Sequence, residues 1–190
     1  MRSCWRLAVL IGASAMLAAC QAGRGSVVSP ADVSERDGWT LVSGVPFVKQ
    51  RSELDCGAAA ITMVLRYWGV PIDAKDVVAT QPAALERGFK ASDLRELVRA
   101  RGLDAFLVNG EPEDLRTEIE RRRPLIVGLA RRANGTAIGH YEVVIGFHHA
   151  RRRVLTLDPA AGWRESSYEE FAAEWAGARQ LALVVFRRAS

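Results

Sequence analysis

The sequence predicts an α+β fold in which an N-terminal helical part packs on an antiparallel β-sheet. Segments with helix signals come first along the chain, and most segments with strand signals come after residue 123. The connections between the later strands are short enough for hairpins, which indicates antiparallel pairing. Helices followed by runs of strands favour separate layers over the alternating units of a doubly wound sheet.

The chain of 190 residues is predicted to have three parts. Residues 1–19 have a basic start, a short apolar run and small residues at the end, which is the layout of a bacterial secretion signal. The apolar run is too short for a comfortable membrane span. Residues 20–38 are rich in Gly, Ser and charged residues and indicate a flexible tether. Residues 39–190 are long enough for one domain with its own core.

The end of the secretion signal carries a more specific pattern. The letters "MLAAC" resemble the lipobox of bacterial lipoproteins, in which cleavage precedes a cysteine that receives lipid such as palmitate. The resemblance implies a lipid anchor on Cys20, and Gln21 after it implies the outer membrane, facing the periplasm. An ordinary signal or an uncleaved anchor is the alternative.

The charge of the chain argues against a nucleic-acid partner. The formal net charge is +4 at pH 7, and the two arginines of the signal would leave with it. The basic triplets 121–123 and 151–153 are typical of solvated ends of helices or strands. The sequence contains no P-loop pattern, so ATP is not expected either. The expected partners are a peptide or protein substrate and, through the lipid, a membrane.

The first helix has clear local signals. A short strand and its exit are expected at 40–50, and Asp55 is a favourable N-cap residue. The helix then runs to about Trp68, with Gly69 as its stop and Pro71 beyond. Apolar residues recur within it at a spacing of four, which indicates a face packed in the core.

The remaining elements follow from periodicity and capping signals. Further helices are expected at 74–79, at 92–101 and from Pro112 to about residue 122. The letters "SYEE" at 167–170 form a capping box that begins a helix through Trp175. Strands are expected at the apolar and β-branched segments 105–109, 124–130, 140–148, 153–158 and 181–186.

Cys56 is the candidate nucleophile. The chain has three cysteines, and loss of Cys4 with the signal and lipidation of Cys20 leave Cys56 without a partner for an internal disulfide. Cys56 lies in the first turn of the first helix, where free N–H groups and the helix dipole favour an anion and lower the pKa of a thiol. The alternatives are a small buried apolar residue or an intermolecular disulfide.

A thiolate nucleophile needs a base, and His140 is the candidate. His140 opens a predicted strand directly after Gly139, which leaves space for close approach. His148 and His149 lie near a predicted hairpin tip among arginines, where solvated histidines are common. The alternative is that His140 is an ordinary polar residue at the end of a strand.

Asp158 and Gln50 complete the candidate site. Asp158 ends the next strand, before Pro159, where it would orient the imidazole of His140. The two side chains share a sheet face if the hairpin loop has three or five residues or if a strand has a bulge, whereas a two-residue loop places them on opposite faces. The sequence leaves these registers open, and Asp158 also fits a simple Asp-Pro turn. Gln50 precedes Cys56 by six residues and would donate to an oxyanion together with the Cys56 N–H, with a surface residue as the alternative.

These residues lie in segments that resemble a known family. The letters "VPFVKQRSELDCGAAAITMVLRYWGV", "GHYEVVIGF" and "VLTLDPAAGW" resemble the bacteriocin-processing (double-glycine) peptidases and their stand-alone relatives, over roughly residues 45–175. The resemblance implies a papain-like cysteine peptidase fold. It also implies roles for four residues: oxyanion donor for Gln50, nucleophile for Cys56, general base and acid for His140, and orienting residue for Asp158.

The resemblance has two departures. Ala58 stands where a proline is common in the family, and alanine suits a helix. Secretory members carry membrane spans and an ATP-binding domain, and these 190 residues show neither pattern. We therefore do not extend bacteriocin leader cleavage to this chain.

The sequence as a whole predicts a lipid-anchored cysteine peptidase that needs no metal, nucleotide or other cofactor. The first alternative is a peptide-binding or envelope assembly module that keeps the fold without turnover. The second is an acyl transferase that uses the same residues with an amine in place of water as the acceptor.

Overall fold

The computed structural model describes residues 25–133 and 136–188. The predicted signal and Cys20 lie outside these ranges. Within them, eight strands form one sheet in the order β1-β7-β6-β5-β4-β8-β3, and β2 pairs with β5 beside this path. The strands are β1 (Ser26–Val27), β2 (Trp39–Leu41), β3 (Asp104–Asn109), β4 (Leu125–Ala133), β5 (Thr136–His148), β6 (Arg153–Asp158), β7 (Gly162–Ser167) and β8 (Leu181–Phe186).

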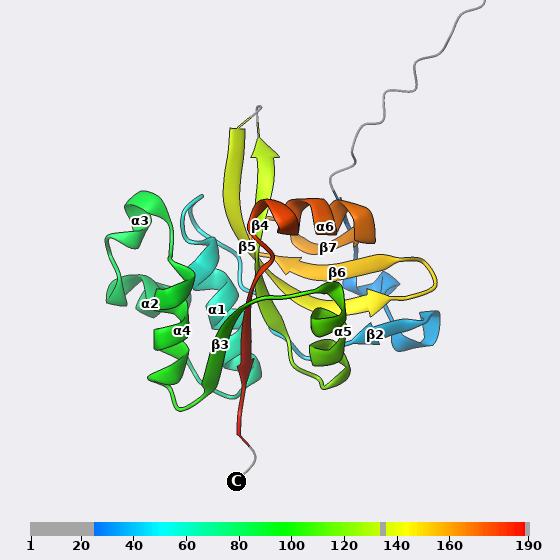
Figure 1. Cartoon of the computed structure of the whole chain (residues 1–190). Helices are drawn as coiled ribbons and strands as arrows, with labels where there is room; N and C mark the ends of the chain where they lie inside the picture. The colour runs from blue at the N-terminus through cyan, green and yellow to red at the C-terminus, as the bar shows by residue number, and fades with distance from the viewer. Residues whose placement is uncertain (1–24, 134–135, 189–190) are drawn as a thin grey trace, which may run out of the picture.

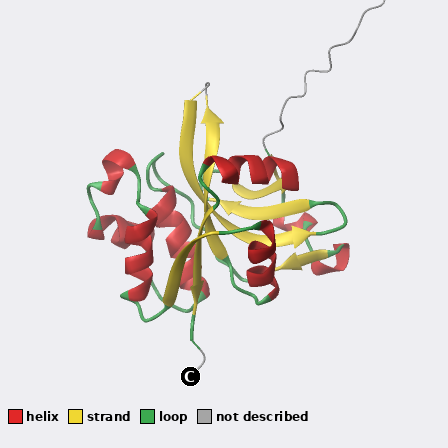
Figure 2. Cartoon of the chain, viewed as in Figure 1, coloured by secondary structure: helices red, strands yellow, loops and turns green. Residues whose placement is uncertain are grey.

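The helices lie beside the sheet in two groups. Figure 1 shows α1 to α4 on one side of the long β4–β5 hairpin and α5 and α6 on the side of β6 and β7, and Figure 2 shows the same separation by colour. The helices are α1 (Cys56–Tyr67), α2 (Ala74–Thr80), α3 (Ala84–Arg87), α4 (Ala91–Arg99), α5 (Pro112–Glu120) and α6 (Tyr168–Gly177). All strand pairs are antiparallel. The predicted α+β fold is therefore confirmed.

Helix α1 is the centre of the N-terminal helical layer. Every residue from Cys56 to Leu65 is buried, and the helix packs against β5, α2 and α4. A helix that is apolar on all sides belongs inside a core rather than at its surface. At the C-terminal end of α1, Arg66 donates to the carbonyl of Ile72 (2.7 Å) and so ties α1 to the beginning of α2.

Several boundaries differ from the predicted ones. A short strand and its exit were expected within residues 40–50, and the strand β2 begins at Trp39 and ends at Leu41. The short helix α3 was not predicted. Strand β5 begins at Thr136 rather than His140 because its pairing with β4 continues to the Ala133–Thr136 pair. Strand β7 was also missed, since "GWRESS" has few apolar residues. It forms because it pairs along the whole of β6.

The described part of the predicted tether is folded onto the domain. Ser26 and Val27 pair with Glu165 and Arg164 of β7, and Val33 packs against the core. Two short 3-10 helices, η1 (Pro30–Asp32) and η2 (Glu35–Asp37), precede β2. The expectation of a flexible tether does not hold for residues 25–38, because the outer edge of β7 offers backbone groups that composition does not reveal.

None of the helices in the described ranges has both the length and the apolar character that a membrane span requires.

Candidate active site

Cys56 is the first residue of α1, as predicted, and it is 6% exposed. The N–H of Ala59 donates to the carbonyl of Asp55 (3.0 Å), which closes the first turn. No side chain caps this end of the helix. The first N–H groups of α1 and the positive end of its dipole therefore remain directed at the region of the Cys56 thiol.

The side chain of Asp55 has a different role from the predicted one. Its carboxylate accepts from the N–H of Arg51 (3.1 Å to each oxygen) and from the N–H of Ser52 (3.0 Å). Asp55 is thus the N-cap residue of α1, as predicted, but its side chain makes no capping hydrogen bond to the helix. The backbone of Asp55 is not extended (φ −103°, ψ 14°), and the carboxylate folds the loop before Cys56.

A β-bulge places His140 and Asp158 on one face of the sheet. Near the hairpin end, β5 and β6 pair Gly146 with Leu155, but beyond Ile145 they pair Val144 with Thr156. One extra residue in β5 reverses which face each later side chain occupies. The loop itself has four residues between the His148–Arg153 pair, so the bulge alone brings the two side chains together.

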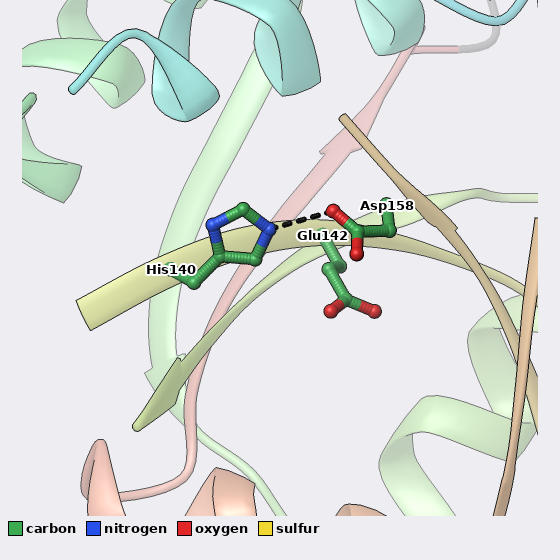
Figure 3. A group of neighbouring side chains, drawn as sticks. All are labelled: His140, Glu142 and Asp158. Carbon is green, nitrogen blue, oxygen red and sulfur yellow. Dashed lines mark hydrogen bonds and ion pairs between the residues drawn. The ribbon is translucent and has the colours of Figure 1, made fainter. Parts of the chain in front are cut away.

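The imidazole and the carboxylate form a direct contact. Nε2 of His140 lies 2.8 Å from Oδ1 of Asp158, and Figure 3 shows the two groups turned toward one another with Glu142 beside them. Burial by itself lowers the pKa of His140, but the hydrogen bond with Asp158 and the influence of the nearby Cys56 side chain outweigh it, so the pKa is raised above its ordinary value. Cys56 and Asp158 therefore act on the same ring from separate elements.

Asp158 is held as a carboxylate. Burial raises its pKa, but the hydrogen bond from His140, the charge of Arg131 and the N–H of Ala160 (2.8 Å) outweigh burial and hold the pKa well below its usual range. The N–H of Ala161 donates to the Asp158 carbonyl (3.2 Å). The turn role considered as the alternative is thus present together with the contact to His140.

Gln50 lies beside the turn that follows Asp158. Its backbone N–H donates to the carbonyl of Pro159 (2.9 Å). Its side-chain Nε2 donates to the carbonyl of Ser52 (2.7 Å), and Oε1 is buried without a hydrogen-bond partner. An amide NH₂ group has two hydrogens, so one N–H remains for another acceptor.

His148 differs from its prediction. It is buried against Trp39, its Nε2 lies 2.8 Å from the carbonyl of Asp37, and its Nδ1 accepts from the N–H of Arg151 (3.2 Å). His148 is therefore a packed structural residue rather than a solvated one, because β2 pairs with this end of β5. His149 is exposed, as predicted.

The sequence reasoning missed the residues that cover the beginning of α1. A Cβ atom at Gly57 would lie 2.8 Å from Cβ of Phe89 and 3.2 Å from Cδ2 of Tyr141. The hydroxyl of Tyr141 donates to the Phe89 carbonyl (3.1 Å). Burial, together with the charges of Cys56 and Asp93, raises the pKa of Tyr141 to about 12. The glycine directly after the cysteine was the available signal for this close approach.

The expected role of Gly139 has no support in the structure. A Cβ atom at this position would meet no described atom within 4 Å. His140 lies inside β5 rather than at its beginning, so its position comes from strand pairing and not from space left by the glycine.

A second missed feature is a set of buried charges behind the imidazole. Ligand atoms of His140, Glu142 and Asp158 lie within 4.8 Å of one another, a grouping that could hold a metal ion. The guanidinium of Arg131 contacts both carboxylates, and Arg164 contacts Glu142. The negative charges are thus already compensated by arginines, so we assign this group to ion pairing.

A cysteine at the start of a central helix, facing a histidine on an antiparallel sheet, is the arrangement of papain-like cysteine peptidases. The chain belongs to the Peptidase C39 family, whose model matches residues 44–190. It is accordingly a cysteine-type peptidase. No curated protein matches the chain.

Solved structures of the same family resemble the chain. One is a double-glycine-motif protease from an AMS/PCAT transporter in complex with the leader peptide, with a TM-score of 0.62 and 26% identity over 77% of this chain and 94% of that chain. The peptidase domain of Streptococcus ComA, a bifunctional ABC transporter of a quorum-sensing pathway, has a TM-score of 0.62 and 21% identity over 76% and 100%. The peptidase domain of Streptococcus mutans ComA has a TM-score of 0.51 and 20% identity over 74% and 98%. The family model confirms the predicted family, and these likenesses confirm the papain-like fold.

Proposed function

We propose that the chain hydrolyses a peptide or amide bond with Cys56 as the nucleophile, His140 as the general base and acid, and Asp158 as the residue that orients His140. The observation that carries the proposal is the 2.8 Å contact between His140 Nε2 and Asp158 Oδ1. This contact directs the other ring nitrogen, Nδ1, away from the carboxylate. The influence of Cys56 on the pKa of the same ring supports Nδ1 as its partner.

In the first half of the reaction, His140 takes the proton of the Cys56 thiol and the thiolate attacks the substrate carbonyl carbon. The carbonyl oxygen becomes an oxyanion, for which the backbone N–H of Cys56 and the second side-chain N–H of Gln50 are the proposed donors. One such donor typically contributes about 2.7–4 kcal/mol to lowering the barrier. The C–N bond then breaks, and the protonated imidazole of His140 gives its proton to the leaving amine.

In the second half, water replaces the amine. His140 takes a proton from the water, and the resulting hydroxide attacks the thioester carbonyl. The C–S bond breaks, the product leaves as a carboxylic acid, and the Cys56 thiol regains its proton. Asp158 stabilises the imidazolium in both halves through the same hydrogen bond.

A peptide is the proposed class of substrate. The double-glycine-motif protease that resembles this chain was solved with a leader peptide, which supports a peptide in the corresponding region here.

We further propose that a lipid on Cys20 anchors the enzyme at the bacterial envelope. The "MLAAC" pattern supports this location. An alkyne analogue of palmitate should label the full-length chain and its Cys56→Ser variant, and it should not label Cys20→Ser. Labelling of Cys20→Ser would refute the anchor and leave the peptidase proposal untouched.

The test of the reaction is hydrolysis of a mixed peptide library by the full-length chain, read by mass spectrometry for new termini. Cys56→Ser should abolish cleavage, and brief incubation followed by acid quenching should trap an acyl group on Cys56 of the unmodified chain. Unchanged cleavage by Cys56→Ser would show that the nucleophile is wrong. Capture of an acyl group that passes to an added amine faster than to water would favour the transferase instead.

A further inference from the structure

Two buried carboxylates lie side by side in the candidate site. Val143 and Leu157 are paired, and the next residues along the two strands are Glu142 and Asp158. The side chain of Glu142 is 0% exposed and that of Asp158 is 2% exposed. Two neighbouring carboxylates in a buried site do not both ionise unless a positive charge compensates them, because repulsion and burial raise the pKa of one.

Arg131 supplies that charge from β4. Its Nη1 donates to Oδ2 of Asp158 (2.9 Å), and its Nη2 forms an ion pair with Oε1 of Glu142. The other oxygen of Asp158, Oδ1, is the one that contacts His140 and the N–H of Ala160. Each oxygen of Asp158 thus has its own donors, and these contacts fix the orientation of the carboxylate.

Glu142 is held in turn by a second set of contacts. It accepts from the hydroxyl of Thr156 and from Nη1 of Arg164 (3.4 Å). Nη2 of Arg164 binds both oxygens of Glu174 of α6 (2.9 and 2.8 Å). The network therefore holds two guanidinium groups and three carboxylates, and it becomes neutral when His140 carries a proton.

We propose that Arg131 and Glu142 are positioning residues for the peptidase reaction: Arg131 keeps Asp158 ionised and aimed at His140, and Glu142 holds Arg131 in place. The inference rests on the proposed function of Cys56, His140 and Asp158. The charged and titratable groups around Arg131, Asp158 and His140 come from β4 (Arg131), β5 (His140, Glu142), β6 (Asp158), β7 (Arg164), α6 (Glu174) and α1 (Cys56).

The test measures the pH at which Cys56 becomes reactive. Iodoacetamide alkylation of the full-length chain is followed at Cys56 by peptide mass spectrometry, which separates it from the other cysteines. In Arg131→Met, the uncompensated carboxylates hold a proton, and the acid limb of the rate profile should move up by about one to three pH units. The double variant Arg131→Met/Glu142→Gln removes the repulsion and should recover at least half of that shift.

The matched control is Arg153→Met. Arg153 forms a partly exposed ion pair with Glu165 on the same sheet (3.3 Å), so its loss should leave the profile unchanged. A profile of folded Arg131→Met that coincides with the unmodified one would overturn the proposal, as would a double variant that recovers nothing. If Arg131 and Glu142 only stabilised the fold, the additional change Glu142→Gln would not restore the pH profile of Cys56 alkylation in Arg131→Met.

Glu142→Gln tests the same relation if Arg131→Met does not fold. Loss of one carboxylate leaves excess positive charge beside His140, so the pKa of His140, followed by its ring proton resonances, should fall. An unchanged value would overturn the proposal. Failure of Cys56→Ser to abolish cleavage would refute the proposed function itself, whereas a normal profile in Arg131→Met with Cys56-dependent cleavage would refute this inference alone.

Discussion

The imidazole of His140 and the carboxylate of Asp158 share a face of the sheet because a bulge at Ile145 changes the register between their strands. On the hairpin side of the bulge, the same alternation would place the two side chains on opposite faces. The contact between His140 and Asp158 thus depends on one extra residue in β5 that is not itself one of the proposed catalytic residues.

His140 and His148 should respond differently to substitution. His140→Gln removes the proposed base and should lower kcat/KM by about 10²–10⁴-fold. His148→Gln disturbs hydrogen bonds with Asp37 and Arg151, so it should destabilise the fold by about 1–3 kcal/mol with little effect on cleavage by the folded protein. Peptide cleavage assays and urea unfolding of both variants check this pair. Equal loss of activity in folded His148→Gln would contradict the assignment of His140 alone.

Gln50 should matter for kcat more than for KM. Gln50→Ala removes the proposed oxyanion donor and should lower kcat by about 10²–10³-fold. Gln50→Glu keeps the size of the side chain but places a negative charge near the developing oxyanion, so it should be at least as slow. Steady-state kinetics on a cleaved library peptide separates the two constants. A change confined to KM would indicate a substrate contact instead of an oxyanion donor.

Folding stability should depend on pH through His140. Its pKa is raised above the ordinary value of 6.5, so its contribution is fully present below that pH and is lost as the pH rises through the folded-state pKa. The free energy of unfolding lost in His140→Gln should therefore be larger at pH 5.5 than at pH 9. Urea titrations at both values, of the unmodified chain and of His140→Gln, measure it. A loss that grows toward pH 9 would contradict the raised pKa.

Gly57 and Gly139 form a matched pair for packing. Gly57→Ala places a Cβ 2.8 Å from Phe89 and should cost about 1–3 kcal/mol of stability. Gly139→Ala meets no described atom within 4 Å and should stay within about 0.5 kcal/mol of the unmodified chain. Thermal and urea unfolding of the two variants provide the comparison. Similar losses at both positions would show that the contact over α1 is not the cause.

Local signals predicted much of the fold. The capping box at Ser167 and Glu170 forms as expected, with both reciprocal hydrogen bonds, because its partners are only three residues apart. Cys56 begins α1 as expected, because the signals that start this helix also lie within a few residues of one another. Asp55 shows where such reasoning stops. Its carboxylate lies near the first N–H groups of α1 and near the N–H groups of the preceding loop. In the folded loop it accepts hydrogen bonds from the N–H groups of Arg51 and Ser52.

The polar strand β7 shows a different limit. Its Arg164 is buried because it meets Glu142 from one strand and Glu174 from a helix. Alternation of apolar and polar residues, read along one segment, treats such a side chain as solvent-exposed. Partners that are 10 and 22 residues away in sequence are not visible in a single segment.

The sequence by itself determined the class of fold, the place of the thiol at a helix N-terminus and the identity of the residues that could serve it, since these follow from composition, spacing and contacts a few residues apart. Only the tertiary structure shows that His140 contacts Asp158, that His148 is buried and that Arg131 forms ion pairs with two buried carboxylates. Those outcomes depend on strand register and on charges brought together from distant segments, and pairing between strands is a property of the whole sheet.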